Sequence, residues 1–222
     1  MKHELYQSIA KVAHALASGN RLQILEYAAQ TERSVEELAA MAGLTVANTS
    51  QHLQALRQAG LVTARKEGLR VFYTAAGEDV VTLVSALRTV AERRVSDVER
   101  LVRAWVGQRD QMEPVSAAEL LDRAQKGLVT VLDVRPAAEY EAGHIPGAIN
   151  VPVDKLERFV SRLPKRKEVI AYCRGPYCLM SFEAVQKLRK RGWRARRLEN
   201  GLPEWRAAGF PVAKGTEDDY RS

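Results

Sequence analysis

Two cysteines five residues apart are the side chains of this 222-residue sequence best suited to covalent chemistry. Cys173 follows the apolar run 169–172, and Cys178 stands directly before a helical pattern that begins near Leu179. A cysteine between a strand and a helix N-terminus has a lowered thiol pKa, because backbone N–H groups and the helix dipole favour the thiolate. The same cradle suits a bound anion such as a persulfide or sulfite. The pattern predicts a reactive Cys173; the alternative is an inert cysteine at a strand end.

The other positions of this loop modify that chemistry. The Cys178 thiol could attack a persulfide on Cys173 and leave a disulfide or a sulfur-bridged pair, or it could simply pack in the first helical turn. Arg174 is the basic side chain expected to assist at the site, whereas Pro176 lacks an N–H and removes one donor. Two cysteines form no disulfide framework, and we expect no metal ion and no cofactor.

Strands and helices alternate in the half of the chain that holds the cysteines. The expected strands are 130–133, 148–151, 169–172 and 194–198. The expected helices are 117–125, 137–141, 154–159, 179–191 and 203–208. Ser116 and Glu119 have the spacing of a capping box at the first of these helices. Alternation of this kind predicts a mainly parallel sheet covered by helices.

The other half is rich in helical patterns. Ser34 and Glu37 form a second capping-box pattern, which begins a short helix that ends near Gly43. A second helix runs from the cap Thr45 to about Ala59. Strands are expected at 61–65 and 70–74, followed by one long helix over 78–105. Two helices joined by a tight turn are typical of a helix-turn-helix, whose second helix enters the major groove of DNA.

Helical spacing divides the second helix into an inner and an outer face. Thr49, Leu53 and Leu56 share one face and are expected to pack inward. Polar side chains suited to DNA lie on the rest of the helix, namely Asn48, Ser50, Gln51, His52 and Gln54. Basic side chains expected to face phosphates are Arg57, Arg65, Lys66 and Arg70. A small helical domain that binds no nucleic acid is the alternative.

Composition sets the class of protein. The net charge of +7 permits nucleic-acid binding, but residues 1–110 hold 14 basic and 12 acidic side chains against 20 and 15 in residues 111–222. The DNA prediction therefore depends on the local pattern. The N-terminus lacks a signal-peptide pattern, and no stretch approaches the about 18 apolar residues needed to span a membrane. We expect a cytoplasmic protein with no membrane partner and a polar link between its halves at Gly107–Pro114.

The runs 15–25 and 44–62 resemble the ArsR family of winged-helix repressors. The resemblance implies a mainly α-helical winged helix-turn-helix domain over residues 1–108. It also implies a homodimer, built through the N-terminal helix and the helix ending near Trp105, that reads a two-fold DNA operator. Members that sense metals through cysteines carry them before the turn, where this sequence has none, and the last helix lacks histidine. This half therefore lacks a sensor of its own.

The runs 131–136, 139–152 and 199–211, together with the Cys173 loop, resemble the rhodanese family. The resemblance implies an α/β domain over residues 113–214, in which Cys173 accepts a sulfane sulfur. Asp133 and Arg135 would hold the surroundings of the site, and His144 would belong to a structural turn. Cys178 stands where active members commonly have arginine, a departure that counts against efficient thiosulfate turnover.

Three hypotheses follow from the two resemblances. The leading one is a repressor that responds to sulfane sulfur from thiosulfate, polysulfide or a persulfide through a Cys173 persulfide. The second is a working sulfurtransferase held near DNA. The third is a sensor of arsenite-like ions that uses Cys173 and Cys178 as ligands.

Overall fold

The computed structural model describes residues 1–107 and 113–216, so part of the predicted link 107–114 lies outside the described residues. The chain divides into two compact units, Met1–Val84 and Ser85–Ser222. Each unit has its own hydrophobic core. No helix within the described ranges is both long and apolar enough to cross a membrane.

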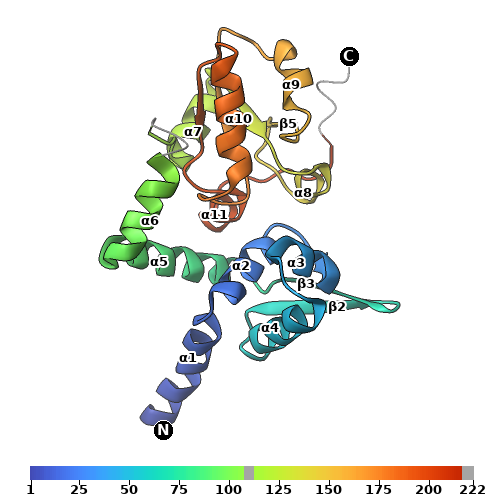
Figure 1. Ribbon diagram of the computed structural model, residues 1–222, viewed down its shortest axis with the longest axis vertical. Helices are drawn as coiled ribbons and strands as arrows, with labels where there is room; N and C mark the ends of the chain where they lie inside the picture. Colours follow the sequence, from blue (N-terminus) through green and yellow to red (C-terminus); the bar gives the residue numbers. More distant parts are fainter. Residues whose placement is uncertain (108–112, 217–222) are drawn as a thin grey trace. The chain divides into compact units, whose positions relative to one another are not determined.

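The first unit contains four complete helices, a small sheet and the start of a fifth helix (Figure 1). Its helices are α1 (Lys2–Leu16), α2 (Gly19–Ala28), α3 (Val35–Ala42), α4 (Val46–Gln58) and the beginning of α5 (Glu78–Arg94). The strands are β1 (Arg33–Ser34), β2 (Val62–Glu67) and β3 (Arg70–Ala75), in the antiparallel order β1-β3-β2. The hairpin confirms the two predicted strands, whereas β1 was not predicted.

Local capping signals explain the helix-turn-helix. The Ser34 Oγ accepts from the backbone N–H of Glu37 at 3.3 Å, and the Glu37 carboxylate accepts from the Ser34 N–H at 2.8 Å, so the predicted capping box is confirmed. Gly43, with φ 65°, ends α3 in the left-handed region that glycine tolerates. The Thr45 Oγ1 then accepts from the Asn48 N–H at 3.2 Å and begins α4.

The predicted long helix over 78–105 is wrong in one respect, because it consists of two helices. Helix α5 ends at Arg94 and α6 (Ser96–Gly107) begins after Val95. Basic side chains in the last turn of α5 and acidic ones in the first turn of α6 match the partial charges of a helix end and a helix start. The helical spacing of apolar residues continues across Val95, so the sequence pattern did not indicate the break between α5 and α6.

The second unit is built on a four-stranded parallel sheet with the order β5-β4-β6-β7. The strands are β4 (Val129–Asp133), β5 (Ile149–Asn150), β6 (Glu168–Tyr172) and β7 (Ala195–Arg197). The helices after α6 are α7 (Ala117–Gln125), α8 (Ala137–Ala142), α9 (Leu156–Phe159), α10 (Leu179–Lys190) and α11 (Leu202–Ala207), and a short 3-10 helix follows α9 at Val160–Arg162. The predicted parallel sheet is confirmed, with element ends shifted by one or two residues.

Alternate side chains of the central strands enter two separate cores. Leu132 and Ala171 pack in one core with side chains of α9 and α10. Val131 and Ile170 pack in the other with side chains of α7 and α11, among them Trp205. Strands that helices cover on both faces consist of nearly continuous apolar residues, and these apolar runs made the strands predictable from the sequence.

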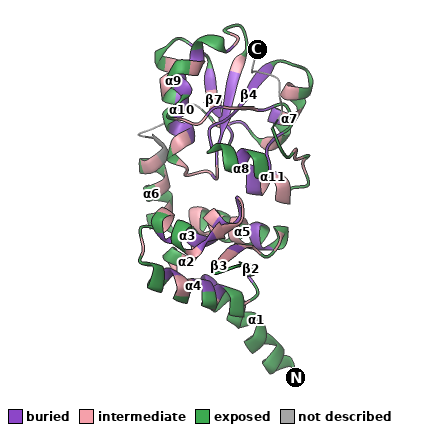
Figure 2. Cartoon of the chain, turned by 90° about the vertical axis from the view of Figure 1, so that its right-hand side faces the viewer, coloured by how far each residue is buried: buried purple, intermediate pink, exposed green. Residues whose placement is uncertain are grey.

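Helix α1 carries an unusual amount of exposed apolar surface. It is exposed along most of its length (Figure 2). The two buried residues of the helix are Ala15 and Leu16. Leu5, Tyr6 and Ile9 are 59%, 61% and 56% exposed. Exposed apolar side chains that share one helix are candidates for contact with a partner.

Candidate functional site

The cysteine loop connects β6 to α10. Cys173 follows the last residue of β6, and Cys178 is the N-cap residue of α10. The two sulfur atoms form a disulfide, with the Cα atoms 6.3 Å apart. Cys173 is 1% exposed within the core under α10, and the half-buried Cys178 packs against the same core. The structure thus brings the two predicted cysteines into direct contact at the strand-to-helix junction.

Backbone contacts hold this loop in place. The Cys173 carbonyl accepts from the Leu202 N–H at 3.3 Å, and the Cys178 N–H donates to the Gly175 carbonyl at 3.2 Å. The Ser181 hydroxyl donates to the Cys178 carbonyl at 2.9 Å. Gly201 lies so close to the loop that a Cβ there would be 2.2 Å from the Arg174 carbonyl oxygen. Sequence reasoning did not single out Gly201, although it lies in the run 199–211 that carried the rhodanese resemblance.

Arg174 is turned toward a buried carboxylate. Its Nε and Nη2 donate to the Glu139 carboxylate at 3.0 Å and 2.6 Å. The Arg174 side chain is 17% exposed and that of Glu139 is fully buried. An anion bound at the loop would therefore share Arg174 with Glu139. Sequence reasoning missed Glu139, because a carboxylate on a short helix usually faces water.

Asp133 and Arg135 form a fully buried ion pair at the end of β4. The Arg135 Nη2 donates to the Asp133 Oδ2 and to the Gly143 carbonyl, both at 2.7 Å, and both side chains are 0% exposed. Burial disfavours the charged guanidinium, but the charge and the hydrogen bonds of Asp133, together with the charge of Glu139, outweigh this effect and raise the pKa of Arg135. The Arg135 Nη1 also lies 4.0 Å from the Glu139 carboxylate. A chain of charges thus connects the end of β4 to the cysteine loop.

His144 lies in this region but is part of the scaffold. Its Nδ1 is 2.9 Å from the Tyr140 carbonyl oxygen, and its ring stacks on the Tyr140 ring at 3.7 Å. Its side chain is 0% exposed. Among residues 1–107 and 113–216, no three Cys, His, Asp or Glu side chains gather in a way that could hold a metal ion.

Helix α4 presents a polar outer face. Its inner side chains Thr49, Leu53 and Leu56 are each 0% exposed, which confirms the predicted inner face. The structure leaves exposed the polar side chains of Asn48, Gln51, Gln54 and Arg57. Ser50 and His52 are half-buried, and the His52 Nε2 lies 3.4 Å from the Asn20 Nδ2.

The hairpin carries the other predicted phosphate contacts. Lys66 and Arg70 are exposed on β2 and β3. Arg65 is half exposed and donates to the carboxylates of Glu32 and Glu67, at 2.6 Å in each case. Hydrogen bonds to these two carboxylates raise the pKa of the guanidinium. A phosphate would have to compete with two carboxylates for Arg65, but exposed pairs of this kind are weak.

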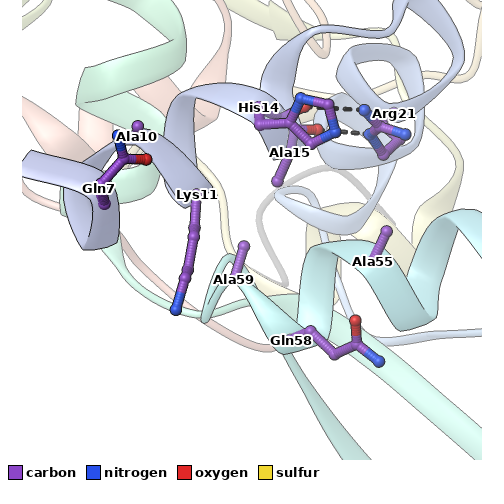
Figure 3. A pocket seen from close by; sticks show the side chains of 9 residues that line it. All are labelled: Gln7, Ala10, Lys11, His14, Ala15, Arg21, Ala55, Gln58 and Ala59. Atoms are coloured by element: carbon purple, nitrogen blue, oxygen red, sulfur yellow. Dashed lines mark hydrogen bonds between the residues drawn. The ribbon is translucent and has the colours of Figure 1, made fainter. Parts of the chain in front are cut away.

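A pocket of about 430 Å³ opens between α1, α2 and the C-terminal part of α4 (Figure 3). The Arg21 guanidinium donates to the carbonyl oxygens of His14 and Ala15, which lie in the last turn of α1. Lys11 and Gln58 also line the pocket. Arg21 thus donates to carbonyls in the last turn of α1, of which that of His14 also accepts from the Ala17 N–H at 3.2 Å, and it fixes the end of α1 against α2.

Two protein-family models match the chain, one in each half. Residues 18–64 match the bacterial regulatory protein arsR family, and residues 116–208 match the rhodanese-like domain. The first match covers the helix-turn-helix, and the second covers the parallel sheet with the cysteine loop. Both family resemblances and the two-part fold class predicted from the sequence are confirmed.

Known proteins resemble either the whole chain or one half. The HTH-type transcriptional regulator Rv0324 of Mycobacterium tuberculosis is 44% identical over 214 residues, which cover 96% of this chain and 94% of that protein. A sulfurtransferase of Allochromatium vinosum is 32% identical over 85 residues, or 38% of this chain and 78% of that protein. The solution structure of the homodimeric winged helix-turn-helix DNA-binding domain of a possible ArsR-family regulator from Mycobacterium bovis is 46% identical. The match covers 42% of this chain and 87% of the chain in that structure, with a TM-score of 0.40.

The similarity to the regulator from Mycobacterium tuberculosis extends over nearly the whole of both chains. Together with the two family matches, this similarity shows the family to which the chain belongs. The chain belongs to the ArsR family of winged helix-turn-helix transcriptional regulators and carries a C-terminal rhodanese-like domain.

Proposed function

We propose that this regulator responds to sulfane sulfur, and that a persulfide on Cys173 changes its affinity for a DNA operator. The observation that carries the proposal is the position of Cys173, at the junction of β6 and α10 with Cys178 in contact. The helix-turn-helix unit has no cysteine of its own. The rhodanese-like domain is therefore the part of the chain with the chemistry to receive a signal.

The chemistry is a transfer of one sulfur atom. In the reduced form of the loop, the Cys173 thiolate attacks the outer sulfur of a donor persulfide or polysulfide, the sulfur–sulfur bond of the donor breaks, and the donor leaves as a thiolate. The N-terminus of the 12-residue helix α10 supports the thiolate, because its partial positive charge lies beside the loop. The charge of Arg174 is largely compensated by Glu139. This favours singly charged donors over the thiosulfate dianion.

Contacts within the Ser85–Ser222 unit support a route from the loop to α5. The Tyr177 hydroxyl donates to the Glu92 carboxylate. Arg88 donates to the Glu204 carboxylate at 3.1 Å and to the Asn200 side-chain oxygen at 3.0 Å. Helix α5 begins at Glu78 in the first unit and ends at Arg94 in the second, so these contacts are made to a helix that belongs to both units. A change of the loop that alters these contacts would favour one arrangement of the regulator over another.

We also infer that the regulator works as a homodimer. Helix α1 exposes Leu5, Tyr6 and Ile9, and α5 exposes Leu83 and Leu87, each 41% exposed or more. A second copy of the chain would bury these apolar side chains. Two copies of α4 would then read the two halves of a symmetric operator.

The first test combines intact mass with operator titrations before and after treatment with glutathione persulfide. We expect a mass gain of about 32 Da for one added sulfur, or a loss of about 2 Da for a disulfide. We expect operator affinity to change by about 5- to 150-fold, the usual range for coupled sites. Cys173→Ser should abolish both changes. Unaltered affinity despite the mass change, together with steady turnover of the donor, would support a sulfurtransferase held near DNA instead.

A second prediction concerns the face of α4. Gln51→Ala should weaken the preference for the operator over a scrambled duplex by about 1–3 kcal/mol, because an amide reads base edges. Arg57→Ala should weaken binding to both duplexes equally and reduce the salt dependence by about one counterion. Fluorescence anisotropy across a salt series measures both effects. An unchanged preference in Gln51→Ala would show that Gln51 reads no base.

A further inference from the structure

We propose that Cys178 is a resolving residue that discharges the Cys173 persulfide as hydrosulfide and leaves a disulfide within the loop. The proposal rests on the proposed function, in which Cys173 carries the persulfide. Spacing alone left Cys178 either as an attacking thiol or as a packed side chain. The contact between the two sulfur atoms favours the first role.

The geometry selects the sulfur that Cys178 attacks. The Cα atoms of Cys173 and Cys178 are 6.3 Å apart, within the usual range of about 4.4–6.8 Å for a direct disulfide. In the disulfide-bonded loop, β6 is paired with β4 and β7, and the Leu202 N–H donates to the Cys173 carbonyl. The disulfide therefore forms without disrupting the sheet. The Cys178 Sγ can therefore reach the Sγ of Cys173 itself, which is the inner sulfur of the persulfide.

The position of Cys178 also suits a nucleophile. It caps a helix of 12 residues, where the partial positive charge of the helix N-terminus favours the thiolate. It is half-buried, whereas Cys173 is 1% exposed. Cys178 is thus a thiol in direct reach of a persulfide on Cys173, which the surrounding core shields from solvent.

The reaction balances without a further reactant. The Cys178 thiolate attacks the Cys173 Sγ, and the bond between this Sγ and the added sulfur breaks. The added sulfur leaves with the electron pair as hydrosulfide, and the Cys173–Cys178 disulfide forms. The sulfane sulfur is reduced and the cysteine pair is oxidised. A persulfide signal is thereby converted into a disulfide, and one hydrosulfide is released per chain.

The test uses the fully reduced, full-length protein with less than one equivalent of glutathione persulfide in the absence of oxygen. Intact mass and released hydrosulfide are followed with time. For the native chain we expect a transient gain of about 32 Da, then a loss of about 2 Da, with one hydrosulfide per disulfide formed. Cys178→Ser keeps the size of the side chain and a good N-cap group. This variant should accumulate the gain of about 32 Da and release no hydrosulfide.

The outcomes separate this inference from the proposed function. A stable gain of about 32 Da in the native chain, or hydrosulfide release by Cys178→Ser at the native rate, would overturn the resolving role but leave the persulfide in place. A native disulfide that forms without hydrosulfide would also overturn it. If neither the native chain nor Cys178→Ser gains or loses mass, the persulfide itself is absent and the proposed function fails. Cys173→Ser should show no change and serves as the control.

Discussion

Replacing Arg135 by alanine is expected to lower the free energy of unfolding of the 85–222 unit by about 3–5 kcal/mol. The side chains of Arg135 and Asp133 are both 0% exposed. Without the guanidinium, the buried Asp133 carboxyl group would lose both the opposite charge beside it and the hydrogen bonds that the Arg135 side chain donates. The Gly143 carbonyl would lose its donor at 2.7 Å as well. Burial disfavours the charged guanidinium, but the charge and hydrogen bonds of Asp133, together with smaller contributions from its other neighbours, raise the pKa of Arg135.

Fluorescence of tryptophan can measure this change in one unit. All three tryptophans lie in residues 85–222, and Trp193 and Trp205 are 7% and 1% exposed. Urea unfolding followed by tryptophan emission should therefore report the second unit. Lys126→Ala is the matched control, because Lys126 and Asp122 form an ion pair at 2.7 Å whose side chains are 61% and 57% exposed. Exposed pairs contribute about 0–1 kcal/mol. Equal losses in the two variants would show that burial of the Asp133–Arg135 pair has little effect on stability.

The elements of the fold were largely predictable because their signals are local. Ser34 and Thr45 cap their helices through residues three positions away, and Gly43 ends α3 by its own backbone conformation. The break between α5 and α6 was missed, because the apolar period that defines a helix continues across Val95. The two-residue strand β1 was missed because its pairing with β3 joins residues about forty positions apart.

The candidate site was predictable only where its residues are neighbours in the sequence. Cys173 and Cys178 share one loop, so their spacing indicated that they could meet. Arg174 and Glu139 are 35 positions apart, and no local pattern indicates that the Glu139 carboxylate on α8 is fully buried and paired with Arg174. The same holds for Gly201. Its importance comes from a close approach of two backbone segments, which no local pattern reports.

This close approach leads to the second large expected effect. In a Gly201→Ala variant, the new Cβ would lie 2.2 Å from the Arg174 carbonyl oxygen, 2.3 Å from the Arg174 carbonyl carbon and 2.6 Å from the Gly175 nitrogen. All three atoms belong to the backbone, so the segment 174–175 must move as a whole. The φ of Gly201 is −99°, a value that any residue adopts, so the effect comes from the contact alone. Cys173 directly precedes this segment and would be displaced.

We expect Gly201→Ala to slow persulfide formation at Cys173 by about 100-fold, the loss that a displacement of about 1 Å can produce at a reacting centre. The rate is measured as the gain of about 32 Da in a Cys178→Ser background, where the resolving thiol is absent. Gly143→Ala is the control, because its Cβ would meet a Val212 side-chain methyl at 3.3 Å and no backbone atom closer. Equal persulfide rates in the two glycine variants would mean that the position of the loop does not control the reactivity of Cys173.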